Sequence, residues 1–350
     1  MSQVSPAFDR PIQYSWQRCR SDYALNPAER RSPSYVALAD LERRRKRTGH
    51  TYAIACAELA ALGQILRGPI GVMLTDPDAV ILSYAGERSF APLARQFGLR
   101  PGAIWSECEQ GTNGMGTCLA ERAPIIIEQR QHFLRQNTAL TCCAVPILNG
   151  TGELVAVLNA STLGSLSGAP TLALLELVAR NIENRTLLET HRAEHFVLRF
   201  HEAREFVSTA AEGMVVIDTV GTIVASNRAA LDMLGTGAYA SVCGRPSVEI
   251  LDVDVPQLKH LVSQPSHHPQ MLRYGPYFVQ AEGPVESRMS ALRGRERAGN
   301  ALQEAERQAL LAVLERHDGN VSRAAASLGL SRRTLHRKMQ RHALRRDELV

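Results

Sequence analysis

The chain has 350 residues, of which 45% are hydrophobic and 21% charged, a composition typical of globular domains rather than of disordered segments. This length suits two or three domains. The N-terminus has no basic start followed by an apolar run, and no stretch approaches the roughly 18 apolar residues of a membrane span, so we expect a cytoplasmic protein without membrane contact.

The net charge of +5 is distributed unevenly. Residues 288–350 hold 14 Lys and Arg against 7 Asp and Glu, a net charge of +7, whereas the rest of the chain holds 26 against 28. A basic segment at one end of a chain indicates a polyanionic partner, with nucleic acid as the first expectation and a solvated basic tail as the alternative.

The cysteines indicate neither a disulfide framework nor a cofactor site. They number seven and include no C-x-x-C pair. Cys118, His132, Cys142 and Cys143 fit no zinc spacing, so we expect them to be packing residues. The glycine-rich stretch 111–116 lacks the lysine of a nucleotide loop, and no triad or paired acid–base group is present, so we expect no enzyme.

The first half of the chain predicts an α+β domain over residues 52–168, preceded by an Arg-rich helical segment over residues 1–51. The basic run 43–47 is expected to be a solvated helix face, with nucleic-acid contact as the alternative. Helices are predicted over residues 52–66 and 90–97, and strands over residues 71–75, 80–84, 124–128, 140–148 and 154–160. Asn-Gly-Thr-Gly at 149–152 predicts a hairpin, and hence an antiparallel sheet.

Residues 169–205 are predicted to form a long connecting helix, because residues 171–206 contain no Gly or Pro and carry an apolar stripe. Such a helix pairs with a copy of itself or packs on its own domain. A smaller α+β domain over residues 206–285 follows, with strands at 213–218 and 221–227. Residues 286–300 are polar and predict a linker.

Residues 301–350 predict an all-α helix-turn-helix domain. A first helix over residues 304–317 precedes a second over residues 321–328, whose paired alanines allow close helix contact. Gly329 supplies a sharp turn, and Ser331 can cap a third helix that ends near residue 342. The alternative is a structural helical hairpin.

The third helix separates a buried and an exposed face. At 100° per residue, Leu335, Met339 and His342 share one side, and two arginines one turn apart mark the opposite side. Arginine reads guanine and glutamine can pair with adenine, whereas the flanks of such a helix suit phosphate contacts by Thr334, Lys338 and Arg341. The expected DNA-contacting residues are Arg332, Arg333, Thr334, His336, Arg337, Lys338, Gln340 and Arg341.

Two segments of this domain, Gly-Asn-Val-Ser-Arg-Ala-Ala at 319–325 and Leu-Gly-Leu-Ser-Arg-Arg-Thr-Leu-His-Arg-Lys at 328–338, closely resemble the Fis-type helix-turn-helix. The resemblance implies binding to double-stranded DNA as a homodimer that reads a two-fold-related site.

A series of upstream motifs resembles the N-terminal half of acetoin-catabolism-type regulators, which are sigma-54 activator-like. The motifs are Ser-Trp-Gln-Arg-Cys at 15–19, Trp-Ser-Glu at 105–107, the stretches 111–117 and 142–147, and His-Phe at 132–133. The resemblance implies a GAF domain that senses a small organic effector, and we expect Trp105, Asn113 and Cys118 to line its pocket. Residues 206–285 resemble a PAS domain, chiefly through 212–214 and 221–227.

The chain departs from that family in the AAA+ ATPase, which we expect to be missing. None of the three lysines follows a glycine, as a phosphate-binding loop requires, and the sigma-54-contacting Gly-Ala-Phe-Thr-Gly-Ala sequence is absent. An activator of this kind would contact RNA polymerase directly or reposition other factors. The alternatives are a constitutive Fis-like architectural or repressor protein with a vestigial sensor, and a GAF-type methionine sulfoxide reductase, against which the missing C-x-x-C argues.

Overall fold

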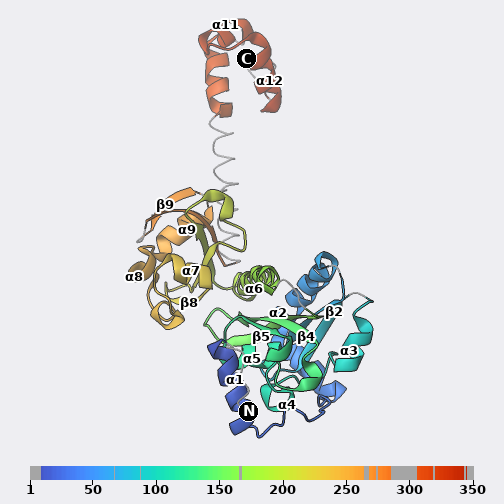
Figure 1. Ribbon diagram of the computed structural model, residues 1–350. Coiled ribbons are helices and arrows are strands. Elements are labelled where there is room, and N and C mark those ends of the chain that lie inside the picture. Colours follow the sequence, from blue (N-terminus) through green and yellow to red (C-terminus); the bar gives the residue numbers. More distant parts are fainter. Residues whose placement is uncertain are drawn as a thin grey trace. The chain divides into compact units, whose positions relative to one another are not determined.

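The chain divides into two compact units, Met1–Pro284 and Val285–Val350. The computed structural model describes residues 9–66, 68–86, 88–164, 168–263, 268–272, 275–284, 306–317, 320–342 and 344. The first unit contains two five-stranded sheets with their helices, and the described part of the second is helical (Figure 1). The α+β multidomain class and the all-α C-terminal end expected from the sequence are confirmed.

The first sheet is antiparallel, with the strand order β2-β1-β5-β4-β3. Its strands are β1 (Ile70–Thr75), β2 (Ile81–Gly86), β3 (Ile125–Glu128), β4 (Leu140–Leu148) and β5 (Leu154–Leu163). The predicted hairpin joins β4 to β5, and Asn149 closes it by accepting the backbone N–H groups of Thr151 and Glu153 at 3.0 and 2.9 Å. All five predicted strands of this domain are confirmed to within a few residues.

Helices cover both faces of this sheet (Figure 1). One face packs against α2 (Leu38–Ile65) and α6 (Gly168–His191). The other carries α1 (Arg10–Ser21), α3 (Ala91–Phe97), α4 (Glu107–Gln110) and α5 (Gly114–Glu121), with 3-10 turns η1 (Gln129–Gln131) and η2 (Arg135–Asn137). Side chains alternate along a strand, so Val72 and Leu74 enter the core under α2 and α6, whereas Met73 enters the opposite core.

Residues 10–51 pack into this first domain and do not form a separate segment as the sequence analysis expected. Ile12 of α1 is 2% exposed and lies in the same core as Met73. The basic run 43–47 lies in α2, where Arg44 forms ion pairs with Asp40, Asp76 and Asp78. Arg44 of this run is therefore bonded within the domain, which disfavours a nucleic-acid contact there.

The predicted long helix is correct only to His191, where α6 ends. Residues 196–201, predicted as its continuation, form strand β6 (Phe196–His201). The apolar Phe-Val-Leu-x-Phe sequence suits a strand that is buried on both faces, and β6 lies in the centre of the second sheet between β7 and β10. The second domain thus begins near residue 196 rather than at residue 206.

The second sheet is antiparallel, with the order β8-β7-β6-β10-β9. Its other strands are β7 (Gly213–Ile217), β8 (Ile223–Ser226), β9 (His268–Leu272) and β10 (Gly275–Glu282), and its helices are α7 (Arg228–Met233), α8 (Ser247–Leu251) and α9 (Val255–Ser263), with 3-10 turns η3 (Arg204–Phe206) and η4 (Tyr239–Ser241). One face, with Phe196 and Leu198, forms a core with these helices, and the other packs on Leu187 of α6. The strands predicted at 213–218 and 221–227 are confirmed.

The two domains of the first unit meet through α6 and the β4–β5 hairpin. The Glu183 carboxylate accepts hydrogen bonds from Arg228 at 2.7 and 3.1 Å, and from the Leu148 backbone N–H at 2.7 Å. Next to it, Asn227 Nδ2 donates to Asn184 Oδ1 at 2.8 Å. Burial raises the pKa of Glu183, which is 7% exposed, and Arg228 offsets only part of this effect. A charge pair between a buried carboxylate and a partly exposed guanidinium therefore joins the two domains.

The C-terminal unit contains a helix over residues 306–316, then α11 (Val321–Ser327) and α12 (Arg332–Arg341). Their common core consists of Leu310, Leu314, Val321, Ala324, Ala325, Leu335, Met339 and Leu344. The predicted linker, residues 286–300, lies outside the described residues. Within the described part of the chain, the helices are too short or too polar to cross a membrane.

Candidate nucleic-acid interface and sensory core

Helix α12 is capped by Ser331 and packs a buried stripe of side chains against its own unit. The Ser331 Oγ accepts the Thr334 backbone N–H at 3.1 Å, which satisfies one of the free donors of the first turn. Leu335 and Met339 are 0% and 4% exposed, and the His342 side chain beyond them is also buried. The predicted buried face of this helix is confirmed.

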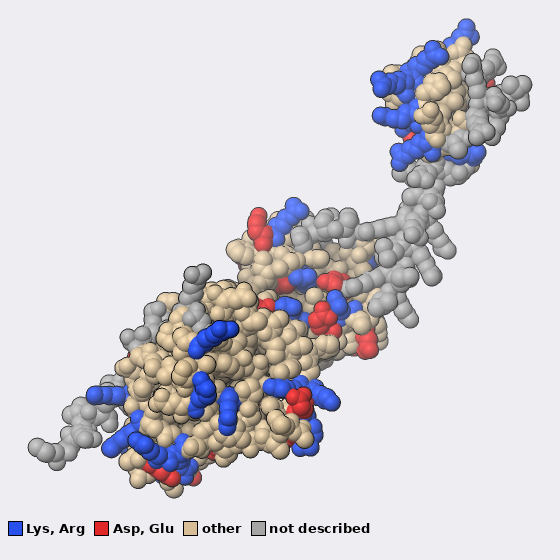
Figure 2. Space-filling model, turned by 90° about the vertical axis from the view of Figure 1, so that its right-hand side faces the viewer, with Lys and Arg blue, Asp and Glu red and all other residues tan. Residues whose placement is uncertain are grey.

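The opposite face of α12 is exposed and basic. Six of the eight predicted DNA-contacting side chains are exposed there, namely Arg332, Arg333, His336, Arg337, Gln340 and Arg341. Thr334 is half-buried, with its Oγ1 2.8 Å from the Ser331 Oγ. Figure 2 shows several of the Lys and Arg side chains of the C-terminal unit along one edge of it. The arginines of this face form no ion pair with the described residues, so the face carries several unneutralised cations close together.

Lys338 differs from the other predicted contacts because it is engaged within the unit. Its Nζ pairs with the Glu306 carboxylate of the first helix, and His342 Nε2 lies 2.9 Å from the other oxygen of the same carboxylate. Lys338 and His342 together lower the pKa of Glu306. Lys338 therefore joins two helices of the domain, and its contact with phosphate stays a prediction.

Helix α11 has the features that hold a recognition helix in place. The Asn320 Oδ1 accepts the Arg323 backbone N–H at 3.2 Å and caps the helix. Ala324 and Ala325 are 0% and 2% exposed, so their small side chains allow close approach to the neighbouring helices. Gly329 has φ +66°, a left-handed conformation that favours glycine at the turn into α12. The predicted paired alanines and the predicted glycine turn are confirmed.

In the first domain, motifs nearly a hundred residues apart meet at one buried carboxylate. Glu107, 3% exposed, accepts a hydrogen bond from Ser15 Oγ at 2.5 Å, and Arg18 donates to both of its oxygens at 2.8 and 3.0 Å. The Ser15 hydroxyl also lies 2.7 Å from the Thr112 Oγ1 of the glycine-rich loop. The Ser-Trp-Gln-Arg-Cys motif therefore holds α1 against α4 and the loop before α5.

The glycine-rich loop is fixed by Asn113. Its Oδ1 accepts the Gly116 N–H at 2.9 Å as the cap of α5, and its Nδ2 donates to the carbonyls of Trp105 and Gly111 at 3.1 and 2.8 Å. A Cβ at Gly116 would lie 2.7 Å from the Glu107 backbone N, so close packing requires glycine there. The loop is a tightly bonded corner of the fold.

The three residues predicted to bind the effector are all in this packed region. Trp105 and Cys118 are 1% and 0% exposed, and Trp105 Nε1 donates to the Gly98 carbonyl at 3.4 Å. Asn113 is 0% exposed and directs both ends of its amide to the protein. Their contacts support the fold, and a direct role in ligand binding stays a prediction.

A group that sequence reasoning missed lies on the sheet face under α3 and α5, around Met73. Asn159 of β5 and Tyr84 of β2 both face Met73 across the sheet, and Thr75 follows two residues along β1. The Asn159 Oδ1, Tyr84 OH and Thr75 Oγ1 are buried without a hydrogen-bond partner among the described residues. An asparagine inside the mostly apolar β5 is the sequence signal that could have indicated this group. Such atoms are available to bond a buried ligand.

Four buried side chains of the first domain are unsuited to reactive chemistry, namely Cys118, His132, Cys142 and Cys143. Burial raises the pKa of Cys142 to about 11 and of Cys143 to about 12, and lowers the pKa of His132 to about 4. Burial also raises the pKa of Cys118. Thiols held protonated are poor nucleophiles and poor metal ligands. Among the described residues, no three His, Cys, Asp or Glu side chains are grouped so as to hold a metal ion.

Two segments of the chain match known families. Residues 51–185 match the GAF domain, and residues 301–342 match the family described as bacterial regulatory proteins of the Fis family. The chain therefore contains a GAF domain and a Fis-type helix-turn-helix.

Two of the similar proteins are regulators whose names mention acetoin. The chain is 33% identical over 270 residues to the acetoin catabolism regulatory protein of Cupriavidus necator, covering 74% of this chain and 40% of that protein. It is 24% identical over 220 residues to the acetoin dehydrogenase operon transcriptional activator AcoR of Bacillus subtilis, covering 62% of this chain and 35% of that protein. The matches thus span less than half the length of these relatives.

Among solved structures, the chain is similar to one in the crystal structure of the E. coli DhaR(N)-DhaL complex. The TM-score is 0.48 and the sequence identity 17%, over 79% of this chain and 100% of that chain.

Proposed function

We propose that this protein is a sequence-specific transcription regulator that responds to a small organic effector through its GAF domain and works without hydrolysing ATP. The observation that carries the proposal is the exposed face of α12, which presents Arg333 and Arg337 one turn apart above the buried pair Leu335 and Met339. A helix of this kind can enter the major groove while its other face stays packed on the domain.

Different residues of α12 have different roles in this proposal. Arg333, Arg337 and Gln340 read base edges, because arginine bonds guanine and glutamine bonds adenine. Arg332, His336 and Arg341, with the hydroxyl of Thr334, contact the backbone and orient the helix. Lys338 contributes by bracing α12 against Glu306. The likeness to the Fis family supports a homodimer on a two-fold-related site.

The effector is proposed to bind on the sheet face around Met73. The unpaired oxygens of Thr75, Tyr84 and Asn159 support a ligand with hydrogen-bonding groups in an otherwise apolar site. Because the relatives are named for acetoin, a small hydroxyketone, acetoin is the first compound to test. The predicted residues Trp105, Asn113 and Cys118 would then support the wall of the site without contributing the polar groups that bond the effector.

The proposed absence of ATPase activity rests on the lysines. The three lysines follow Arg45, Leu258 and Arg337, so the sequence contains no Gly-Lys pair for a phosphate-binding loop. Purified protein should hydrolyse no ATP, with or without its DNA. DNA-stimulated ATP hydrolysis would contradict this part of the proposal, and transcription would then be tested for dependence on sigma-54 rather than on direct contact with RNA polymerase.

The test of DNA reading is a binding titration of the full chain on selected genomic fragments and on scrambled duplexes. Arg337→Ala should lose affinity for the selected site, and Arg316→Ala, an exposed arginine of the first helix, is the matched control. If both variants lost the same DNA affinity, or neither lost any, the proposed placement of α12 in the major groove would be contradicted.

The test of sensing is calorimetry with acetoin and related small molecules, followed by DNA titrations with and without the compound that binds. Asn159→Leu should remove ligand binding while leaving DNA binding of the free protein unchanged. If no compound changes DNA affinity, the constitutive Fis-like alternative is favoured. Turnover of methionine sulfoxide with a thiol reductant would favour the reductase alternative, which the buried, protonated thiols disfavour.

A further inference from the structure

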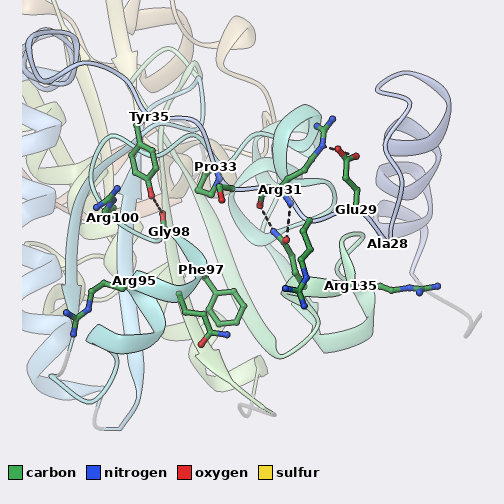
Figure 3. Close-up of a pocket in the computed structure, with 14 residues that line it drawn as sticks. Ala28, Glu29, Arg31, Pro33, Tyr35, Arg95, Phe97, Gly98, Arg100 and Arg135 are labelled. Atoms are coloured by element: carbon green, nitrogen blue, oxygen red, sulfur yellow. Dashed lines mark hydrogen bonds and ion pairs between the residues drawn. The ribbon is translucent and has the colours of Figure 1, made fainter.

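A hollow of about 810 Å³ opens on the surface of the first domain (Figure 3). Its walls are the loop over residues 28–35, the end of α3 with the turn to Arg100, and the start of η2. These three segments are far apart in the sequence, and neither the DNA-binding face nor the proposed effector site uses them.

The base of the hollow is held by a set of short contacts. Gln136 bonds the Arg31 backbone twice, because its Oε1 accepts the Arg31 N–H at 3.0 Å and its Nε2 donates to the Arg31 carbonyl at 2.5 Å. At the other end, the Tyr35 hydroxyl lies 3.5 Å from the Gly98 carbonyl. The loop over residues 28–35 is therefore tied to η2 and to the end of α3, which shapes the hollow before any ligand enters.

The charge of the lining is strongly positive. It includes five arginines, at positions 30, 31, 95, 100 and 135, against the single acidic residue Glu29. Glu29 pairs with Arg31 at 3.1 Å, and Arg100 lies over the Tyr35 ring at 4.3 Å. Arg30, Arg95 and Arg135 are exposed and form no ion pair with the described residues. Three guanidinium groups thus have unused capacity for anions.

The unpaired arginines are spread around the hollow and do not converge on one point. Figure 3 shows the Arg95 and Arg135 side chains on opposite sides of it, pointing apart. One phosphate or carboxylate cannot reach both, so the complement is an extended ligand with several separated negative charges. We propose that the hollow binds an acidic segment, rich in Asp and Glu, of a partner protein.

A flexible peptide fits this site better than DNA does. Duplex DNA is stiff over about 150 base pairs and would meet only the rim, whereas an extended peptide can enter the hollow and place successive carboxylates near separate arginines. Arginine is suited to this because its planar fork bonds a carboxylate through two parallel N–H groups. The regulator would thereby receive a protein signal through a surface separate from its effector site.

The experiment uses the full chain and a fluorescent oligo-glutamate peptide that carries a photo-crosslinking group. Anisotropy is measured with duplex DNA in saturating amount, so that the basic face of α12 is occupied. Arg95→Glu/Arg135→Glu should weaken peptide binding by roughly tenfold or more, because the new carboxylates repel the ligand. Arg88→Glu/Arg130→Glu, at exposed arginines outside the lining, is the matched control and should bind as the unmodified chain does.

Crosslinks should map to residues 28–35 and 95–100, which locates the peptide directly. The proposal is overturned if the peptide does not bind, if both double variants lose affinity equally, or if citrate competes as strongly as the peptide, which would indicate a small-anion site. It is also overturned if Arg95→Glu/Arg135→Glu weakens DNA binding as Arg337→Ala does, because the hollow would then belong to the DNA interface.

Discussion

Removing the cation of the domain-joining pair should strongly destabilise the first unit. Arg228→Leu leaves the Glu183 carboxylate, 7% exposed, without its cation, and losing one partner of a buried pair costs about 3–5 kcal/mol. The Arg228 side chain is 27% exposed, so water can reach the vacated space and we expect a loss near 3 kcal/mol. Glu183→Gln in the same chain should recover most of it, because the amide oxygen still accepts the Leu148 N–H.

The stability cost of Arg228→Leu should also depend on pH. Burial already raises the pKa of Glu183 in the folded protein, and losing Arg228 raises it further. A folded-state pKa above the unfolded value means that the protonated form favours folding. The deficit of Arg228→Leu should therefore be small below the unfolded pKa of about 4.3 and grow as pH rises through the raised folded pKa.

The assay is urea unfolding at acidic and at mildly alkaline pH, followed by fluorescence of Trp16 and Trp105, the two tryptophans of the chain. Both lie in the first domain, so the signal reports its unfolding. The reasoning is refuted if Arg228→Leu costs less than about 0.5 kcal/mol at alkaline pH, or if its cost is the same at both pH values.

Four further predictions concern the recognition helix and the loop of the GAF domain. Arg337→Ala should cost roughly 1–3 kcal/mol on the specific site and relax base preference at one or two positions, as measured by titration on a set of single-base variants. Lys338→Ala should alter the salt dependence of DNA binding less than Arg341→Ala does, because Glu306 already engages Lys338; equal slopes in the two variants would contradict this. Leu335→Asp should abolish binding by unpacking the C-terminal unit, seen as a loss of helical circular dichroism. Asn113→Ala should destabilise the first domain by about 2 kcal/mol in urea, since it removes a helix cap and two backbone contacts together.

The elements that the sequence predicts well are those whose pattern is local. The two strands around the 149–152 hairpin are mostly apolar runs joined by their own turn. The C-terminal helices carry their caps, their glycine turn and their apolar stripe within about twenty residues. Residues 196–201 differ, because their apolar spacing suits a helix as well as a strand. They form a strand because they pair with β7 and with β10, which lies some eighty residues away in the sequence.

The site residues, too, are predictable where their surroundings are close in the sequence and unpredictable where they are distant. The exposed positions of α12 follow from the helix period alone. The position of Lys338 does not, because Glu306 lies 32 residues away on another helix. The role of Ser15 likewise depends on Glu107, 92 residues later. The motif could therefore be recognised in the sequence, but the contact that it makes could not be predicted. The role of Asn159 could not be predicted either, because the sequence does not show which residues lie beside it across the sheet.

Helix α6 makes the first unit difficult to divide experimentally. Its earlier turns place Leu175 and Ala179 in the core of the first sheet, and a later turn places Leu187 on the second sheet. A truncated fragment that ends at residue 191 would expose Leu187 and Glu183 to water, and one that begins at residue 196 would leave an uncovered apolar sheet face. Expression boundaries and chimaeric sensors should therefore keep residues 10–284 intact, with fusions made in the segment between this unit and the helix-turn-helix.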